Sequence, residues 1–256
     1  MIPTALLLIV VCAAFFVEAI TGFGSTVLTV AFGALLLPLD VLLPAVVPVN
    51  LALSLWLVAR HLKHVDWRLL LRGILPWMAL GFPLGMWLYA RLAGAHERWL
   101  LLGFGVFVVA LAAFELIGDR TRAQSGEGPR PLGRFPGIGL LIVGGVVHGA
   151  FSSGGPMAVY VASRRTGDKA AFRATLSALW LVLGIVLVTS YALKGGLTPR
   201  TARLSIELVP SLAIGLVLGE RAHTRIPAAL FRTTVLMLLL VGGALLAGRS
   251  MLTGGS

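Results

Sequence analysis

The sequence has 256 residues, of which 58% are hydrophobic and only 12% are charged. Since soluble domains carry about 25% charged residues, this composition excludes a soluble protein and is typical of a chain that lies largely within a membrane. The formal net charge is +11, but the basic residues lie in short segments between apolar runs, so topology explains them better than nucleic-acid binding does. The single cysteine, Cys12, excludes an intramolecular disulfide and a cysteine-based metal site, and we expect neither a metal nor a cofactor.

Eight apolar runs follow one another along the chain, and a polar segment divides them into two groups of four. Residues 1–117 form an N-terminal transmembrane repeat, residues 118–135 a polar linker rich in Gly and Pro, and residues 136–256 a C-terminal transmembrane repeat. Hydrophobicity on all sides favours helices, because strands of a membrane barrel would alternate. The expected fold is therefore an all-α polytopic membrane protein. The runs cover residues 4–37, 41–59, 69–90, 99–117, 136–162, 174–193, 204–219 and 230–248.

The first element of each half is interrupted by small and polar residues. Gly and Ser permit the helix to unwind, and unwound backbone at membrane depth is tolerated only where it is buried in protein or lines a cavity. Each break is therefore a candidate binding loop, and the alternative is that its glycines serve close helix packing. The candidate substrate-binding residues of the breaks are Thr21, Gly22, Gly24, Ser25 and Thr26 in the first half and Ser152, Ser153, Gly154 and Gly155 in the second.

Hydroxyl groups and exposed backbone N–H groups at a break, followed by a helix N-terminus, make an anion site that needs no fixed charge. Two further residues are candidates for substrate contact. Asn50 is the only amide within a span, and Arg173 stands at the start of the sixth run, where it could pair with an anion entering the second loop. The alternatives are a bond from Asn50 to a neighbouring helix and an interfacial position for Arg173.

Two ionisable residues lie within the broken elements, each four residues before its break. Glu18 precedes Gly22, and His148 precedes Ser152. Because an ionisable group at membrane depth is costly, it is a functional hypothesis by default, and either side chain could carry a proton coupled to transport. The alternatives are that Glu18 lies near the interface and that His148 is a hydrogen-bonded packing residue.

Five residues of the first half recur in the second half in the same order and at the same spacing. Such a repeat is typical of secondary transporters, which bind substrate near the bilayer midplane between their two halves. We expect the repeated glycines to serve helix packing. The residues are Pro76, Gly81, Gly85, Arg91 and Arg98, which match Pro210, Gly215, Gly219, Arg225 and Arg232.

The distribution of basic residues favours one topology. If the first element of each half re-enters the membrane and the N-terminus lies outside, 15 of the 21 lysine and arginine residues face the cytoplasm. If all eight elements span, the inside holds 12 of them. The positive-inside rule therefore favours re-entrant first elements with three spans in each half. An odd number of spans inverts the second half relative to the first.

Two short motifs stand at the breaks. They are Gly22-Phe23-Gly24-Ser25 in the first half and, in the second, Ser153-Gly154-Gly155-Pro156 followed by Asp168-Lys169, Phe172-Arg173 and Thr175. Together with the two-half layout, which covers nearly the whole chain, these motifs resemble the sulfite exporter TauE/SafE family of membrane proteins. In that family the first motif usually has more glycines, where this chain has Ser25 and Thr26. The resemblance implies a transporter of sulfite, sulfonates or related organosulfur anions.

We therefore expect a secondary transporter of the cytoplasmic (inner) membrane, not an enzyme, that binds sulfite or an organosulfonate between the two loops and is coupled to protons. Its expected partners are this small anionic substrate, the lipid bilayer and a coupling proton; nucleic acid is not among them, and a homodimer is left open. A passive anion channel is the first alternative. An intramembrane hydrolase using Ser152 or Ser153 with His148 is disfavoured, because nucleophile and base would share one short loop.

Overall fold

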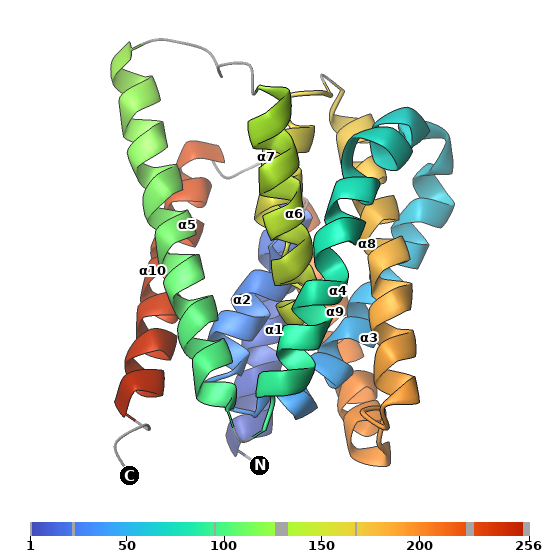
Figure 1. Cartoon of the computed structure of the whole chain (residues 1–256), viewed down its shortest axis with the longest axis vertical. Coiled ribbons are helices and arrows are strands. Elements are labelled where there is room, and N and C mark those ends of the chain that lie inside the picture. Colours follow the sequence, from blue (N-terminus) through green and yellow to red (C-terminus); the bar gives the residue numbers. More distant parts are fainter. Residues whose placement is uncertain are drawn as a thin grey trace.

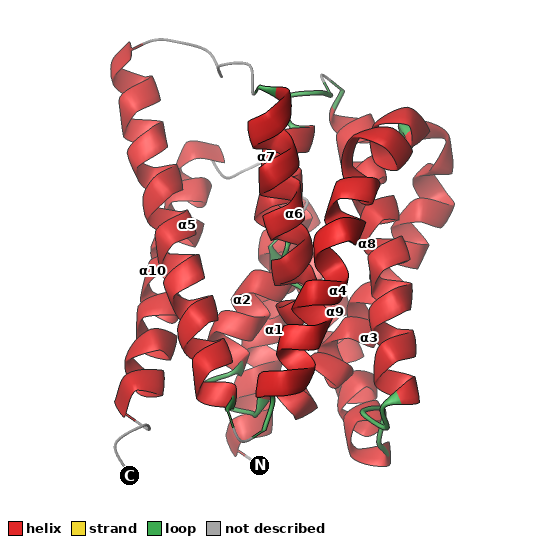
Figure 2. Cartoon of the chain, in the orientation of Figure 1, coloured by secondary structure: helices red, strands yellow, loops and turns green. Residues whose placement is uncertain are grey.

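The computed structural model describes residues 2–21, 24–94, 96–125, 133–166, 168–223 and 228–252, and helices account for nearly all of them (Figure 2). The described residues contain no strand, so the expected all-helical fold is confirmed. The helices are α1 (Ile2–Thr21), α2 (Ser25–Gly33), α3 (Leu39–His61), η1 (Leu62–His64), η2 (Leu69–Ile74), α4 (Leu75–Leu92), α5 (Glu97–Ser125), α6 (Arg134–Phe151), α7 (Gly155–Ala162), α8 (Lys169–Leu193), α9 (Pro199–His223) and α10 (Ala228–Leu252).

Six helical segments of the described chain are long and apolar enough to cross a membrane. Helices α1 and α6 are apolar but shorter, over Thr4–Ile20 and Phe135–Phe151. A span needs about 20 apolar residues. The six candidate spans are Leu39–His64, Leu69–Leu92, Glu97–Gly118, Ala170–Leu193, Pro199–Ala222 and Thr233–Leu252.

Local sequence explains where α8 begins. Asp168 caps α8, because its carboxylate accepts hydrogen bonds from the backbone N–H groups of Ala171 and Ala170. These two bonds lower the pKa of the Asp168 carboxyl, since they stabilise its ionised form. Helix α5 continues to Ser125, into the segment expected as a polar linker, and residues 126–132 of that linker lie outside the described residues.

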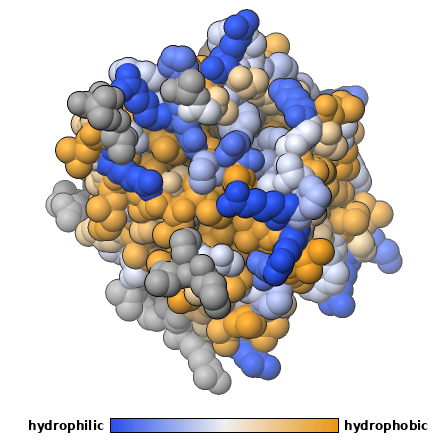
Figure 3. Space-filling view, turned by 90° about the horizontal axis from the view of Figure 1, so that it is seen from below, coloured by the Kyte–Doolittle hydropathy of each residue, from blue (hydrophilic) through white to orange (hydrophobic). Residues whose placement is uncertain are grey.

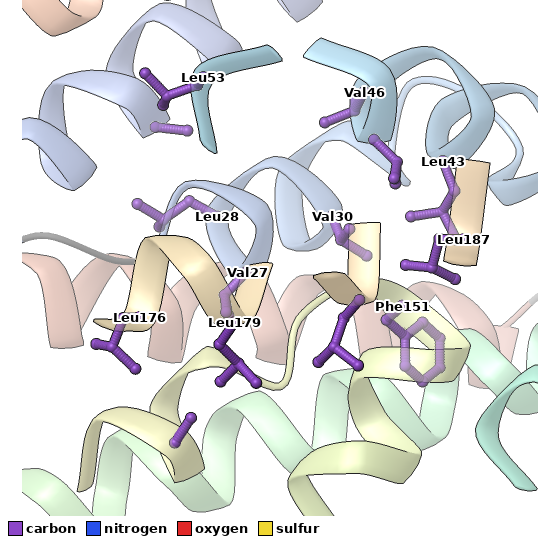
Figure 4. Close-up of a cluster of buried hydrophobic side chains, with 14 of the residues drawn as sticks. Val27, Leu28, Val30, Leu43, Val46, Leu53, Phe151, Leu176, Leu179 and Leu187 are labelled. Atoms are coloured by element: carbon purple, nitrogen blue, oxygen red, sulfur yellow. The ribbon is translucent and has the colours of Figure 1, made fainter. Parts of the chain in front are cut away.

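The helices pack as pairs that join the two halves of the chain. Helix α1 lies against α9, α4 against α6, and α3 against α8, while α5 and α10 form a pair at one edge of the bundle (Figure 1). In Figure 1, α1 starts at the lower end of the bundle and α6 at the upper end. Side chains from α2, α3 and α8 gather beside Phe151 in the buried core (Figure 4).

The repeated glycines make two of these close contacts, as expected for packing residues. A Cβ on Gly81 or Gly85 would fall on a backbone carbonyl oxygen of α6, that of Ile142 or Val146. A Cβ on Gly215 or Gly219 would likewise fall on a backbone carbonyl oxygen of α1, that of Cys12 or Phe16. Only glycine lets the backbones of these helices approach so closely.

Large apolar side chains cover much of the outer surface, including Ile206, which is 72% exposed, and Leu80, which is 65% exposed. Seen from the end at which α1 starts and α10 ends, hydrophilic side chains are scattered over the face with hydrophobic side chains between them (Figure 3). Exposed apolar area of this extent is unusual for a soluble monomer and suits contact with lipid.

Candidate functional site

A small cavity of about 40 Å³ lies where α1, α2, α3, α6, α7 and α8 meet. Because one water molecule needs roughly 10–15 Å³ of such space, the cavity has room for only a few non-hydrogen atoms. None of the described residues that line it is a lysine or an arginine. The lining residues are Glu18, Gly24, Ser25, Thr26, Val47, Asn50, Leu51, Ser54, His148, Ser152, Gly155, Trp180 and Gly184.

Most of the residues predicted from the two breaks meet at this cavity. They come from both halves of the chain, although more than 100 residues separate Ser25 from Ser152 in the sequence. The predicted residues that line it are Glu18, Gly24, Ser25, Thr26, Asn50, His148, Ser152 and Gly155. Ser153, Gly154 and Arg173 are not among the lining residues, and the side chain of Thr21 and the whole of Gly22 lie outside the described residues.

Two helices begin at the cavity. Ser25 is the first residue of α2 and Gly155 the first residue of α7, and both line the cavity. The backbone turns there through left-handed conformations, with φ of 101° at Gly24 and 55° at Ser152. The first turn of a helix leaves backbone N–H groups without helical partners, and these groups attract anions.

In the first half, Ser25 links two of the lining side chains. Its hydroxyl donates to Asn50 Oδ1 over 3.4 Å, and its hydroxyl and backbone N–H also lie near the carboxyl group of the half-buried Glu18. Asn50 Nδ2 is buried and has no hydrogen-bond partner among the described residues. Asn50 therefore has an unused donor at the cavity.

In the second half, His148 is 4% exposed and is fixed on two sides. Its Nδ1 atom accepts from the backbone N–H of Gly154 over 3.4 Å, and its ring stacks on Trp180 with 5.2 Å between ring centres. A neutral imidazole that accepts at Nδ1 carries its proton on Nε2. Nε2 has no partner among the described residues, so His148 is a second unused donor.

The remaining predicted residues have other contacts. The hydroxyl of Ser153, which is fully buried, donates to the carbonyl of Phe151 over 2.9 Å. A Cβ on Gly154 would fall on the carbonyl oxygen of Gly144, so this glycine lets α7 approach α6. Arg173 is half-buried near the start of α8 and interacts electrostatically with Glu18.

The sequence did not single out Trp180, Ser54 or the apolar lining residues Val47 and Leu51. Trp180 carried one usable signal. It lies in the middle of an apolar run, whereas tryptophans that anchor a span at the interface lie near its ends. Among the described residues, no group of three or more His, Cys, Asp and Glu side chains could hold a metal ion.

Six apolar helices of the described chain are long enough to cross a membrane, and two of them, α3 and α8, meet α1, α2, α6 and α7 around a small cavity; this is the architecture of a polytopic membrane transporter. The family model described as "Sulfite exporter TauE/SafE" matches residues 6–246. The chain therefore belongs to this family, as its two motifs suggested, and it is a membrane transporter rather than an enzyme.

Two named relatives are similar over most of their length. The probable inner membrane transporter protein TsaS of Comamonas testosteroni is 28% identical over 187 residues, which cover 72% of this chain and 73% of the relative. The probable sulfite/organosulfonate exporter TauE of Cupriavidus necator is 28% identical over 239 residues, which cover 90% and 88%. No solved structure matches this chain. With the six candidate spans, these relatives confirm the expected location in a membrane.

Proposed function

We propose that this protein is a secondary transporter of the inner membrane that carries a small sulfur-containing anion, sulfite or an organosulfonate, through the central cavity. Two buried donors at the cavity support this proposal most directly, because neither has a hydrogen-bond partner among the described residues. They are Asn50 Nδ2 from the first half and His148 Nε2 from the second. A buried donor without a partner costs about 1–3 kcal/mol. An oxyanion that accepts from both groups removes that cost. The name of the Cupriavidus necator relative supports a sulfur oxyanion as the ligand.

A site that is made of neutral donors binds an anion reversibly, as a transporter requires. Neutral donors and the N-termini of α2 and α7 attract an anion, while no cation among the described lining residues holds it in a charged pair. A lysine in the cavity would add the Coulomb attraction of a full opposite charge to these hydrogen bonds and would slow release of the anion. The anion can therefore leave on the other side of the membrane.

The two halves are, in this proposal, inverted repeats. The first helix of each half packs on the fourth α-helix of the other half: α1 packs on α9, and α6 packs on α4, through the repeated glycines. The pairs α1–α2 and α6–α7 then form re-entrant hairpins from opposite membrane faces, consistent with their starts at opposite ends of the bundle (Figure 1). This topology has the cytoplasmic excess of basic residues described above.

Proton coupling follows from the position of Glu18 in the same cavity. An ionised carboxylate and an anion repel each other in so small a space, so the anion binds best when Glu18 carries a proton. Arg173, which interacts with Glu18, offsets the negative charge when the cavity is empty. His148 is the alternative carrier of the proton.

The test is binding and flux of sulfite with purified protein, first in detergent and then in proteoliposomes. Asn50→Leu and His148→Phe each remove one donor, and we expect Kd to rise about 10- to 150-fold, since a hydrogen bond to a charged group contributes about 1.5–3 kcal/mol. Ser153→Ala is the control, because it removes a hydroxyl from the same loop that is bonded to Phe151 and does not line the cavity.

The control variant should bind sulfite like the parent. Parent-like binding by both donor variants would refute the proposed site. Flux that saturates with sulfite concentration supports a carrier, whereas flux that stays linear supports the passive channel.

A further inference from the structure

Trp180 on α8 is the largest side chain that lines the cavity, and the proposed anion site does not use it. Its indole stacks on the imidazole of His148 with the two ring planes 19° apart. Its Cζ2 atom lies 3.8 Å from the position that a Cβ on Gly155 would take. The indole therefore spans the second break, from the last turn of α6 to the first residue of α7.

Residues of α3 also line the cavity beside Trp180. Val47 and Leu51 line it from α3, and α3 packs against α8. A Cβ on Gly184 would lie 3.2 Å from Leu51 Cδ1, which is tighter than ordinary van der Waals contact. The two helices touch one turn after Trp180, which limits how far α3 and α8 can separate beside the indole.

The remaining volume decides which anion fits. The cavity of about 40 Å³ corresponds to roughly three water-sized spheres. Sulfite, with one sulfur and three oxygen atoms, is of that size. An organosulfonate such as 2-hydroxyethanesulfonate carries the same sulfur and three oxygens plus a tail of two carbons and one oxygen. That tail needs more space than a cavity of this volume leaves beside the sulfonate group, and Trp180 is the largest side chain in the lining.

On the basis of the proposed function, we infer that Trp180 sets the size limit of the site, so that it accepts an inorganic sulfur oxyanion and excludes organosulfonates with a two-carbon tail. The stack on His148 also holds the imidazole with Nε2 free for the anion. Trp180 is thus a specificity residue. An aromatic ring of smaller size at this position keeps the stack, whereas alanine removes both the stack and the wall.

The experiment measures Kd for sulfite, methanesulfonate and 2-hydroxyethanesulfonate with the purified full chain. The parent is compared with Trp180→Phe, Trp180→Leu and Trp180→Ala. Trp56→Ala is the matched control, since Trp56 is also a tryptophan within a span but is 39% exposed and does not line the cavity. Melting temperature in detergent reports whether each variant is folded.

We expect the parent and Trp56→Ala to bind sulfite at least about tenfold more tightly than 2-hydroxyethanesulfonate, with methanesulfonate between them. Trp180→Phe should keep most of this preference. In Trp180→Leu and Trp180→Ala, the ratio of Kd for 2-hydroxyethanesulfonate to Kd for sulfite should fall by about tenfold or more. If Trp180→Ala does not fold, the Leu variant and the parent's own preference decide.

A parent that binds the two-carbon sulfonate as tightly as sulfite overturns the size limit and leaves the proposed function intact. An unchanged preference for sulfite in a folded Trp180→Leu or Trp180→Ala variant likewise overturns the size limit and leaves the proposed function intact. A parent that binds none of the three anions refutes the proposed function and this inference with it.

Discussion

Replacing Glu18 by glutamine should separate anion binding from proton coupling. Glu18 lines the cavity of about 40 Å³ that the anion would occupy, and we take the separation of the two charges as about 5 Å in Coulomb's law. At an effective dielectric constant of about 20, two like charges at that distance repel by about 3 kcal/mol. This corresponds to a loss of roughly 150-fold in affinity when Glu18 is ionised. Glutamine keeps the shape of the protonated carboxyl and cannot ionise.

The sign of the pH dependence follows from this repulsion. The parent should bind sulfite most tightly below the titration of Glu18, and its affinity should fall as the pH rises through that titration, by up to about tenfold per pH unit. Glu18→Gln should hold the tighter affinity across the range. Sulfite also titrates, and the glutamine variant measures the pH dependence that sulfite and His148 together contribute without Glu18.

The assay is calorimetric binding across pH, followed by two flux measurements in proteoliposomes. Glu18→Gln should still exchange labelled for unlabelled sulfite and should fail to accumulate sulfite in response to a pH gradient. A glutamine variant that keeps the parent's pH profile and its gradient-driven accumulation would refute the reasoning. The same comparison with His148→Gln would then test the second half as the proton carrier.

Three further predictions concern packing, backbone conformation and topology. Gly81→Val forces α4 away from α6 and should lower the free energy of unfolding in detergent by about 1–3 kcal/mol. Gly103→Val is the control and should cost far less, because a Cβ there meets nothing within 4 Å. Equal losses in the two variants would contradict the packing role. Gly24→Ala has space for its methyl group but keeps a φ of 101°, so it should cost about 1–3 kcal/mol through backbone strain alone; an unchanged melt would speak against a left-handed turn there. With the native cysteine replaced by serine, an impermeant thiol reagent outside the cell should label Gly196→Cys and not His64→Cys, and labelling of the latter would reverse the proposed topology.

The sequence was sufficient to locate most of the polar residues that gather at the cavity, because polar groups are exceptional within apolar runs. Glu18, Asn50 and His148 stand out for this reason, since each would be costly in lipid without a purpose. The repeated glycines were equally recognisable, because their spacing puts them on one face of a helix. Their roles in substrate binding and proton transfer stay predictions.

The sequence could not tell which of two adjacent serines faces the cavity. Ser152 and Ser153 are chemically alike, and the left-handed backbone of Ser152 turns one toward the cavity and the other toward the carbonyl of Phe151. Nor could it indicate that α1 packs on α9, because the choice of partner depends on how helix faces fit after the whole chain has assembled. The place of Trp180 in the middle of an apolar run sets it apart in the sequence, but its position at the cavity depends on that same assembly.

The contact between α1 and α9 also has a consequence for biogenesis. Helix α1 is synthesised well before its glycine-lined partner surface on α9, which follows about 180 residues later in the chain. At about 5–20 residues per second, this interval lasts roughly 10–40 s. During that time a short apolar helix that carries Glu18 has no partner in the second half. We therefore expect the nascent chain to need the insertion machinery, or a membrane chaperone, until α9 arrives.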